Sequence, residues 1–399
     1  TITIPAGATI TNNGTQTGFG RTGAVDWQTT PKTSTFTASD GEGYFINSGS
    51  AITMNLPAGS AGAIVAVSDY ARNFATYNLT ITPNGSEKIG GVAASAKLDV
   101  NGQAATFVYT DSTKGWINVQ NAEDTEEGAT FVAATGGTVT TCGNFKIHTF
   151  TGPGTFCVSS VGSPGGSNTI DYLVIAGGGG GGDGAGSSTN AGGGGGAGGY
   201  RESSGTASGS YTVSPLGSGV SALPVAVTGY PVTIGAGGTT GSSGSNSVFS
   251  GTTTITSAGG GNGGNGSTSQ TTGSTGGSGG GANTNPGAGA AGNTPPVSPP
   301  QGNPGGSGLG CTSGGGGGAT AAGSNAAPGS GGAGGTGATS SINGTPTTRA
   351  TGGDGGPTSG PAGTPQTANT GNGAPRGGAP GNAGGTGGSG IVIIRYRFQ

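Results

Sequence analysis

The chain is poor in charge, sulfur and histidine. Of its 399 residues, 7% are Asp, Glu, Lys or Arg, and there are three cysteines, one methionine and one histidine. The formal net charge of −3 provides no basic face that could neutralise phosphates, which argues against nucleic-acid binding. No apolar run reaches the length of about 18 residues that a membrane-spanning helix needs, so we expect no membrane insertion.

Motifs for catalysis and cofactor binding are also missing. No Gly-Lys-Ser/Thr sequence indicates a P-loop, and no G-x-G-x-x-G opens a helix within a βαβ unit. No paired carboxylates stand out at catalytic spacing. His148 has no Cys/His cluster near it in sequence, so we interpret it as an exposed strand histidine rather than a metal ligand or a general base. The sequence therefore predicts no enzyme activity, no cofactor and no metal site.

The three cysteines do not form a disulfide framework, because their number is odd. Cys142 and Cys157 flank a predicted hairpin whose arms are residues 144–150 and 155–161, joined by a Gly-Pro-Gly turn. Spacing alone cannot supply the geometry that a disulfide requires, so a bond between these two cysteines stays open.

Glycine is what the chain has in excess, and it is unevenly distributed. Residues 1–162 hold 22 of the 99 glycines, and 99 − 22 leaves 77 for residues 163–399. The second share, near one in three, is far above the usual level of about 7%. Disordered segments are usually rich in charge, whereas residues 163–390 hold only seven charged side chains. The chain therefore has two regimes, and the second is not an ordinary disordered tail.

The first regime has the pattern of short strands and turns. Ile52, Met54 and Leu56 alternate on one face, and residues 105–119 form a predicted hairpin with its turn at 111–115. The acidic stretch at 121–129 lacks the glycine-centred loop of an EF-hand, so a linker is favoured over a calcium site.

No helical period occurs in the chain, and we expect an all-β protein without an α-helical domain. Its predicted parts are an N-terminal β segment (1–32), a β-rich module (33–120), an acidic linker (121–129), a β-hairpin connector (130–162) and a glycine-rich domain (163–399).

Apolar strands frame the glycine-rich region at both ends. The sequence DYLVIAGGGGGG opens it at 171–182 and IVIIRYRF closes it at 391–398, so we expect these strands to lie together. A glycine-rich chain can form an extended left-handed helix with three residues per turn and about 3.1 Å rise. Such helices have no internal hydrogen bonds, and bundling would satisfy their backbone groups. We therefore predict bundled polyglycine II helices, with residues 177–182 ordered and bonded to neighbouring glycine runs.

Residues 35–399 resemble tail-fibre proteins of marine bacteriophages, including phages of cyanobacteria. The most specific parts are 172–182, 232–238 and 387–396, and Cys142 and Cys157 stand where the family pattern has Ser or Thr. The resemblance implies a homotrimer in the virion tail, assembled in the cytoplasm of the host bacterium. It further implies contacts with other tail or baseplate proteins, and a glycine-rich C-terminal tip that binds a host-surface glycan or outer-membrane protein.

Large or charged residues between the glycine runs are the candidates for receptor contact. They are Tyr200, Arg201, Arg349 and Arg376, whose alternative role is simply to keep loops soluble. A capsid-surface or neck decoration protein without a receptor is the main alternative function. A host surface adhesin and an ice-binding bundle are further alternatives, although the runs are too irregular for the flat Thr or Ala face of the latter.

Overall fold

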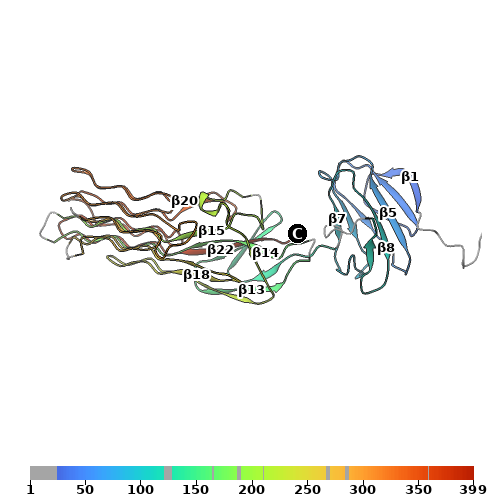
Figure 1. Cartoon of the computed structure of the whole chain (residues 1–399), viewed down its shortest axis with the longest axis horizontal. Coiled ribbons are helices and arrows are strands. Elements are labelled where there is room, and N and C mark those ends of the chain that lie inside the picture. Colours follow the sequence, from blue (N-terminus) through green and yellow to red (C-terminus); the bar gives the residue numbers. More distant parts are fainter. Residues whose placement is uncertain are drawn as a thin grey trace, which may run out of the picture. The chain divides into compact units, whose positions relative to one another are not determined.

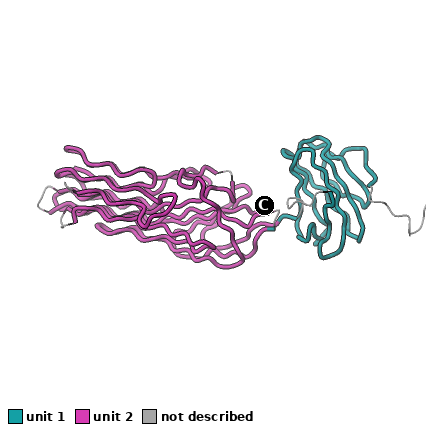
Figure 2. Tube along the Cα trace, viewed as in Figure 1, with its two compact units in different colours: residues 1–129, 163–165 teal, residues 130–162, 166–399 magenta. Residues whose placement is uncertain are grey.

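A computed structural model describes residues 25–120, 128–163, 166–186, 190–209, 211–266, 270–283, 287–357 and 359–399. The fold is essentially all-β, as predicted (Figure 1). The chain divides into two compact units, the first formed by Thr1–Ala129 with Ser163–Gly165 and the second by Thr130–Gly162 with Gly166–Gln399 (Figure 2). Most of the predicted N-terminal segment and of the acidic linker, residues 1–24 and 121–127, lies outside the described residues.

The first unit is a sandwich of two sheets, with strand orders β1-β3-β5-β8-β9 and β2-β4-β6-β7. The strands are β1 (Asp26–Lys32), β2 (Phe36–Thr37), β3 (Glu42–Ile46), β4 (Ile52–Asn55), β5 (Ile64–Asp69), β6 (Leu79–Thr82), β7 (Ala96–Leu98), β8 (Ala104–Tyr109) and β9 (Trp116–Asn118). From β1 to β6 the chain alternates between the sheets, and neighbours within a sheet run parallel. The later strands complete each sheet in antiparallel pairing.

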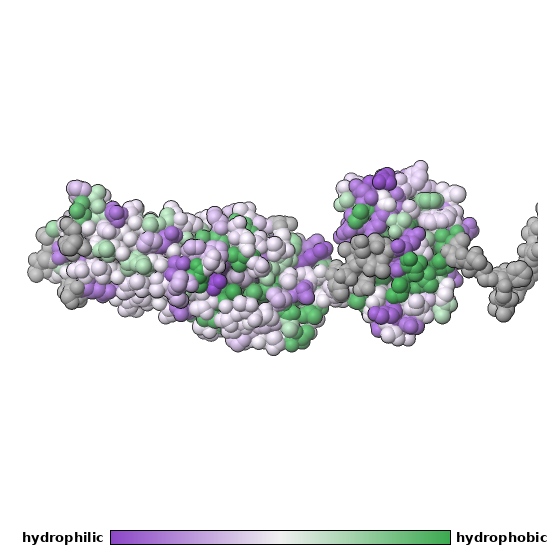
Figure 3. Space-filling view, viewed as in Figure 1, coloured by the Kyte–Doolittle hydropathy of each residue, from purple (hydrophilic) through white to green (hydrophobic). Residues whose placement is uncertain are grey.

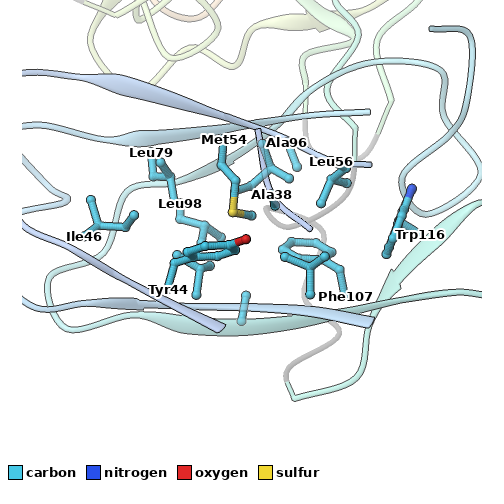
Figure 4. Close-up of a cluster of buried hydrophobic side chains, with 14 of the residues drawn as sticks. Ala38, Tyr44, Ile46, Met54, Leu56, Leu79, Ala96, Leu98, Phe107 and Trp116 are labelled. Carbon is cyan, nitrogen blue, oxygen red and sulfur yellow. The ribbon is translucent and has the colours of Figure 1, made fainter. Parts of the chain in front are cut away.

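A side-chain core fills the space between these sheets. Figure 4 shows Tyr44, Met54 and Phe107 pointing toward one another among aliphatic neighbours. Ile52, Met54 and Leu56 are all buried, which confirms the alternation predicted from sequence. The hairpin of β8 and β9 is confirmed as well, and the Asp111 carboxylate accepts two backbone N–H groups of its turn, at 2.7 and 2.8 Å.

Two sheets form the base of the second unit, with orders β10-β13-β17-β18-β19 and β11-β12-β22-β14-β15, and a small β20-β21 pair lies apart. The strands are β10 (Ala133–Thr135), β11 (Thr138–Cys142), β12 (Phe145–Phe150), β13 (Gly154–Ser160), β14 (Thr169–Ile175), β15 (Tyr200–Glu202), β16 (Leu223–Pro224), β17 (Gly229–Thr233), β18 (Ser247–Ser250), β19 (Thr254–Ser257), β20 (Ala338–Ser340), β21 (Thr347–Arg349) and β22 (Ile391–Arg397). A 3₁₀ turn, η2, covers Pro215–Gly217.

The strands that frame the glycine region are neighbours, as predicted. β14 and β22 pair antiparallel, from Asp171 opposite Arg395 to Ile175 opposite Ile391. Alternate residues of β14 enter two different clusters, Tyr172 on one face and Leu173 on the other. Burial of both faces explains why these strands are continuous apolar runs instead of alternating ones.

The predicted hairpin between residues 144–150 and 155–161 is wrong. β12 pairs with β11 and β22, whereas β13 pairs with β10 and β17, so the two arms belong to different sheets. Each arm pairs with other strands on both of its edges, which leaves no edge free for a local hairpin. Six residues of β12 pair with residues of the distant β22. Cys142 and Cys157 are exposed free thiols on these separate sheets.

The first glycine run is ordered and bonded to other runs, as predicted. Every third N–H group of the run donates to the same neighbouring segment. The first and fourth residues of 177–182 donate to segment 242–245, the second and fifth to 385–388, and the third and sixth to 193–196, over 2.8 to 3.1 Å. This period of three is the period of a polyglycine II helix.

The carbonyl groups of the same run complete a six-neighbour arrangement. With the same period of three, they accept hydrogen bonds from segments 260–263, 238–241 and 374–377, over 2.8 to 3.0 Å. A Cβ on any glycine of 177–182 would lie closer than 3.0 Å to a carbonyl oxygen of a neighbouring segment. Glycine is therefore required here because backbones approach one another directly, and the extended passes run side by side in Figure 1.

Chain reversals gather at one end of this bundle. Ala185 N donates to Asn190 O at 2.9 Å, and Gly381 N donates to Ala185 O at 2.9 Å, so these reversals lie at one level. Segments 308–312 and 326–330 reverse next to each other, with Ala326 N donating to Ser307 O at 2.8 Å. The frame thus holds several short turns together at its end.

Candidate functional site

Two of the four candidate contact residues are buried. Tyr200, in β15, and Arg349, in β21, are 2% and 6% exposed. The Tyr200 hydroxyl donates to Glu202 Oε2 at 3.0 Å, and the Glu202 carboxylate also accepts from the Ser214 N–H and the Ser340 hydroxyl. Burial raises the pKa of Glu202 and of Tyr200 and lowers that of Arg349. These residues form an internal polar cluster that ties β15 to β20 and β21.

A second internal cluster lies on β14, which sequence reasoning did not find. Asp171 is fully buried, and its carboxylate accepts from the Ser203 hydroxyl at 2.7 Å and from the Ser208 N–H and hydroxyl at 2.7 and 2.6 Å. Its cross-strand neighbour Arg395 lies over the rings of Phe145 and Tyr211, at 4.5 and 5.0 Å. The only sign of this cluster in the sequence is that Asp171, an acidic residue, stands near the start of an apolar strand.

His148 is buried, so its interpretation as an exposed strand histidine is wrong. It is 0% exposed, its Nδ1 lies 2.7 Å from the carbonyl oxygen of Gly136, and its Nε2 lies 3.1 Å from the Tyr396 hydroxyl. The ring is covered because β22, from the far end of the chain, pairs with β12 and brings Tyr396 against it. Burial lowers the pKa of His148.

Arg201 and Arg376 remain partly exposed, at different places. Arg201 lies on β15 opposite Val174 and borders a small cavity of about 10 Å³, room for a single water molecule. Arg376 lies in the glycine bundle, where it lines a groove of about 240 Å³ with Asp354, Pro361 and Thr364. Arg376 therefore lines an open groove large enough for a small ligand, whereas Tyr200 and Arg349 are buried.

The Arg376 side chain lies flat on glycine backbone. A Cβ added to Gly356 or Gly360 would collide with its guanidinium group, so the absence of side chains at these positions makes room for it. Within the described ranges the guanidinium forms no ion pair, and burial lowers the pKa of Arg376. A partly desolvated cation without an acidic partner faces the groove.

The bundle surface carries little charge or apolar area on the face seen in Figure 3, where most of it is near neutral in hydropathy. In the part of the chain that the structure describes, no group of three His, Cys, Asp or Glu side chains could hold a metal ion. Among the same residues, no helix is long and apolar enough to cross a membrane.

The second unit is thus a bundle of glycine helices on a base of two sheets. A family model for a glycine-rich domain matches residues 150–397, more than half of the chain, and the chain belongs to this family. The match begins in β12 and ends in β22, so it includes both strands that frame the bundle. A search of curated proteins found no significant match.

Proposed function

We propose that the chain is a non-enzymatic virion protein, a bacteriophage tail fibre whose glycine-rich unit recognises the host-cell surface. The observation that carries the proposal is the clustering of short turns at one end of a frame bonded through its backbone. Loops held on a rigid scaffold are where recognition residues concentrate. The similarity to phage tail-fibre sequences supports the same assignment.

The frame suits a recognition role because its order does not depend on the turns. The turn at 308–312 is closed by two backbone hydrogen bonds between Leu309 and Thr312, at 2.9 and 3.0 Å. Leu309 is 39% exposed, so its side chain is available for contact. Such turns can change in sequence while the glycine helices beneath them keep their hydrogen bonds.

The proposal includes the assembly implied by the sequence resemblance. The chain would act as a homotrimer joined to other tail or baseplate proteins of the virion, and its receptor would be a surface glycan or an outer-membrane protein. A capsid-surface or neck decoration protein without a receptor is the alternative, because the same frame could serve a purely structural role.

Competition for adsorption tests the recognition role. The purified full chain should slow adsorption of the parent phage to its host, because free tips occupy the receptor. Gold-labelled antibody against the chain should mark the distal tail fibres on virions in electron micrographs. Label on the head or neck, together with no competition, would favour the decoration protein and overturn the proposal.

A further inference from the structure

We propose that the groove at Arg376 binds a sugar ring bearing an oxyanion, a carboxylate or a phosphate. The inference rests on the proposed function, since it names the ligand class that this part of the bundle would recognise. The groove lies between glycine segments 353–356, 360–364 and 374–378. Segment 374–378 carries Arg376, whose charged side chain lies against the glycine backbone of the other two segments.

The positive charge of the groove comes from the guanidinium group of Arg376. Arg376 is half-buried and its guanidinium contacts the backbone of Gly356, Gly360 and Gly378, which fixes the group in place. In the described parts of the chain it has neither a hydrogen bond nor an ion pair. The planar fork of an arginine matches the two oxygens of a carboxylate or a phosphate, and holding it in place reduces the entropy lost on binding.

The rest of the groove fits a single sugar ring. Its volume of about 240 Å³ is below the range of roughly 300–1,000 Å³ that is typical of sites for drug-sized ligands. Pro361 and Pro375 provide apolar walls, and the exposed Thr364 provides a hydroxyl that can exchange hydrogen bonds with sugar hydroxyls. A large apolar ligand would not fit a groove of this volume.

Asp354 gives the groove a second, opposing charge. Its Oδ1 accepts the N–H of Gly334 at 2.8 Å, and its carboxylate is exposed at the groove. A carboxylate here weakens the attraction for an oxyanion and selects ligands whose hydroxyls can reach it. Replacement by asparagine keeps the acceptor for Gly334 and removes the charge.

Titration of the full chain with three small probes tests the proposal. We expect galacturonate and glucose 6-phosphate to bind in saturation-transfer NMR, and galactose to bind at least about tenfold more weakly, because the guanidinium loses its charged partner. The stronger of the two anionic probes identifies the source of the oxyanion. Arg376→Gln should weaken binding about ten- to hundredfold, whereas Asp354→Asn should strengthen it. Arg72→Gln, a change to an exposed arginine of the first unit, is the matched control.

Equal binding of galactose and galacturonate, or unchanged binding by Arg376→Gln, would overturn the inference. Thermal unfolding of each variant checks that the fold is kept, and Arg376→Lys provides a second variant that keeps the charge without the planar fork.

Adsorption competition separates this proposal from the proposed function. If the wild-type chain competes and Arg376→Gln competes equally well, the function stands and this site does not. If the wild-type chain binds galacturonate but does not compete, the site stands and the function does not.

Discussion

The two units reach order by opposite means. In the first unit, large side chains such as Met54, Phe107 and Trp116 fill the space between two sheets and are 0% exposed. In the glycine bundle, backbone meets backbone, and donors and acceptors of residues 177–182 are paired with six neighbouring segments. The first is stabilised by apolar burial and the second by hydrogen bonds between segments without side chains. One unit should therefore be weakened by removing atoms and the other by adding them.

The strongest test adds one methyl group to the centre of the bundle. Gly179 donates to Gly196 O at 2.8 Å and accepts from Ala374 N at 3.0 Å, and a Cβ on it would collide with Gly261 O. Because the chains cannot move apart without breaking these bonds, Gly179→Ala should cost about 5 kcal/mol in the free energy of unfolding. Hydrogen exchange measured by peptide should become fast throughout the bundle and stay unchanged in the first unit.

Gly152→Ala is the matched control within the same unit. No atom lies within 4 Å of the position that its Cβ would occupy, so the change should be nearly neutral. Equal protection of the bundle in Gly179→Ala and in Gly152→Ala would contradict the six-neighbour packing, since it would mean that a side chain is tolerated at the centre.

The converse test removes atoms from the first unit. Phe107, on β8, is 0% exposed and lies at the centre of the side-chain core (Figure 4). Phe107→Ala should lower the free energy of unfolding by about 4 kcal/mol, because it leaves a cavity as well as losing apolar burial. Urea unfolding followed by tryptophan fluorescence measures this, with Val119→Ala, at a side chain that is 58% exposed, as the control. A similar small effect for both variants would mean that Phe107 does not carry the core.

How far the sequence could predict the fold differs between short-range and long-range features. Glycine runs and the strands at their ends could be recognised locally, because composition and period act within a few residues. The partners of β12 could not, because β22 begins about 240 residues later, at Ile391, and replaces the nearby arm as its neighbour. The burial of His148 follows from the same long-range pairing, whereas Tyr200 is buried in a cluster that includes the distant Ala338 and Ile393. Arg376 could be identified as a candidate, but the groove around it depends on three segments that only the fold brings together.

The smallest expected effect concerns pH, and it distinguishes the sheet base from both the bundle and the first unit. His148 is the sole histidine in the chain, it is buried, and its pKa is lowered from the usual 6.5. Between that lowered value and 6.5 the unfolded chain binds more protons, so stability is complete above about pH 6.5 and falls as the pH drops through this window. The slope cannot exceed about 1.4 kcal/mol per pH unit for one proton.

Urea midpoints between about pH 5.5 and about pH 7.5 measure this slope, because histidine is the ordinary side chain that titrates in this range. His148→Phe should abolish the slope whatever it does to the absolute stability, and peptides of the first unit should show no change in exchange beyond the intrinsic effect of pH. A slope of the same sign that survives in His148→Phe would contradict its assignment to His148. Glu202 could not account for such a slope, because burial raises the pKa of Glu202 and gives a slope of the opposite sign.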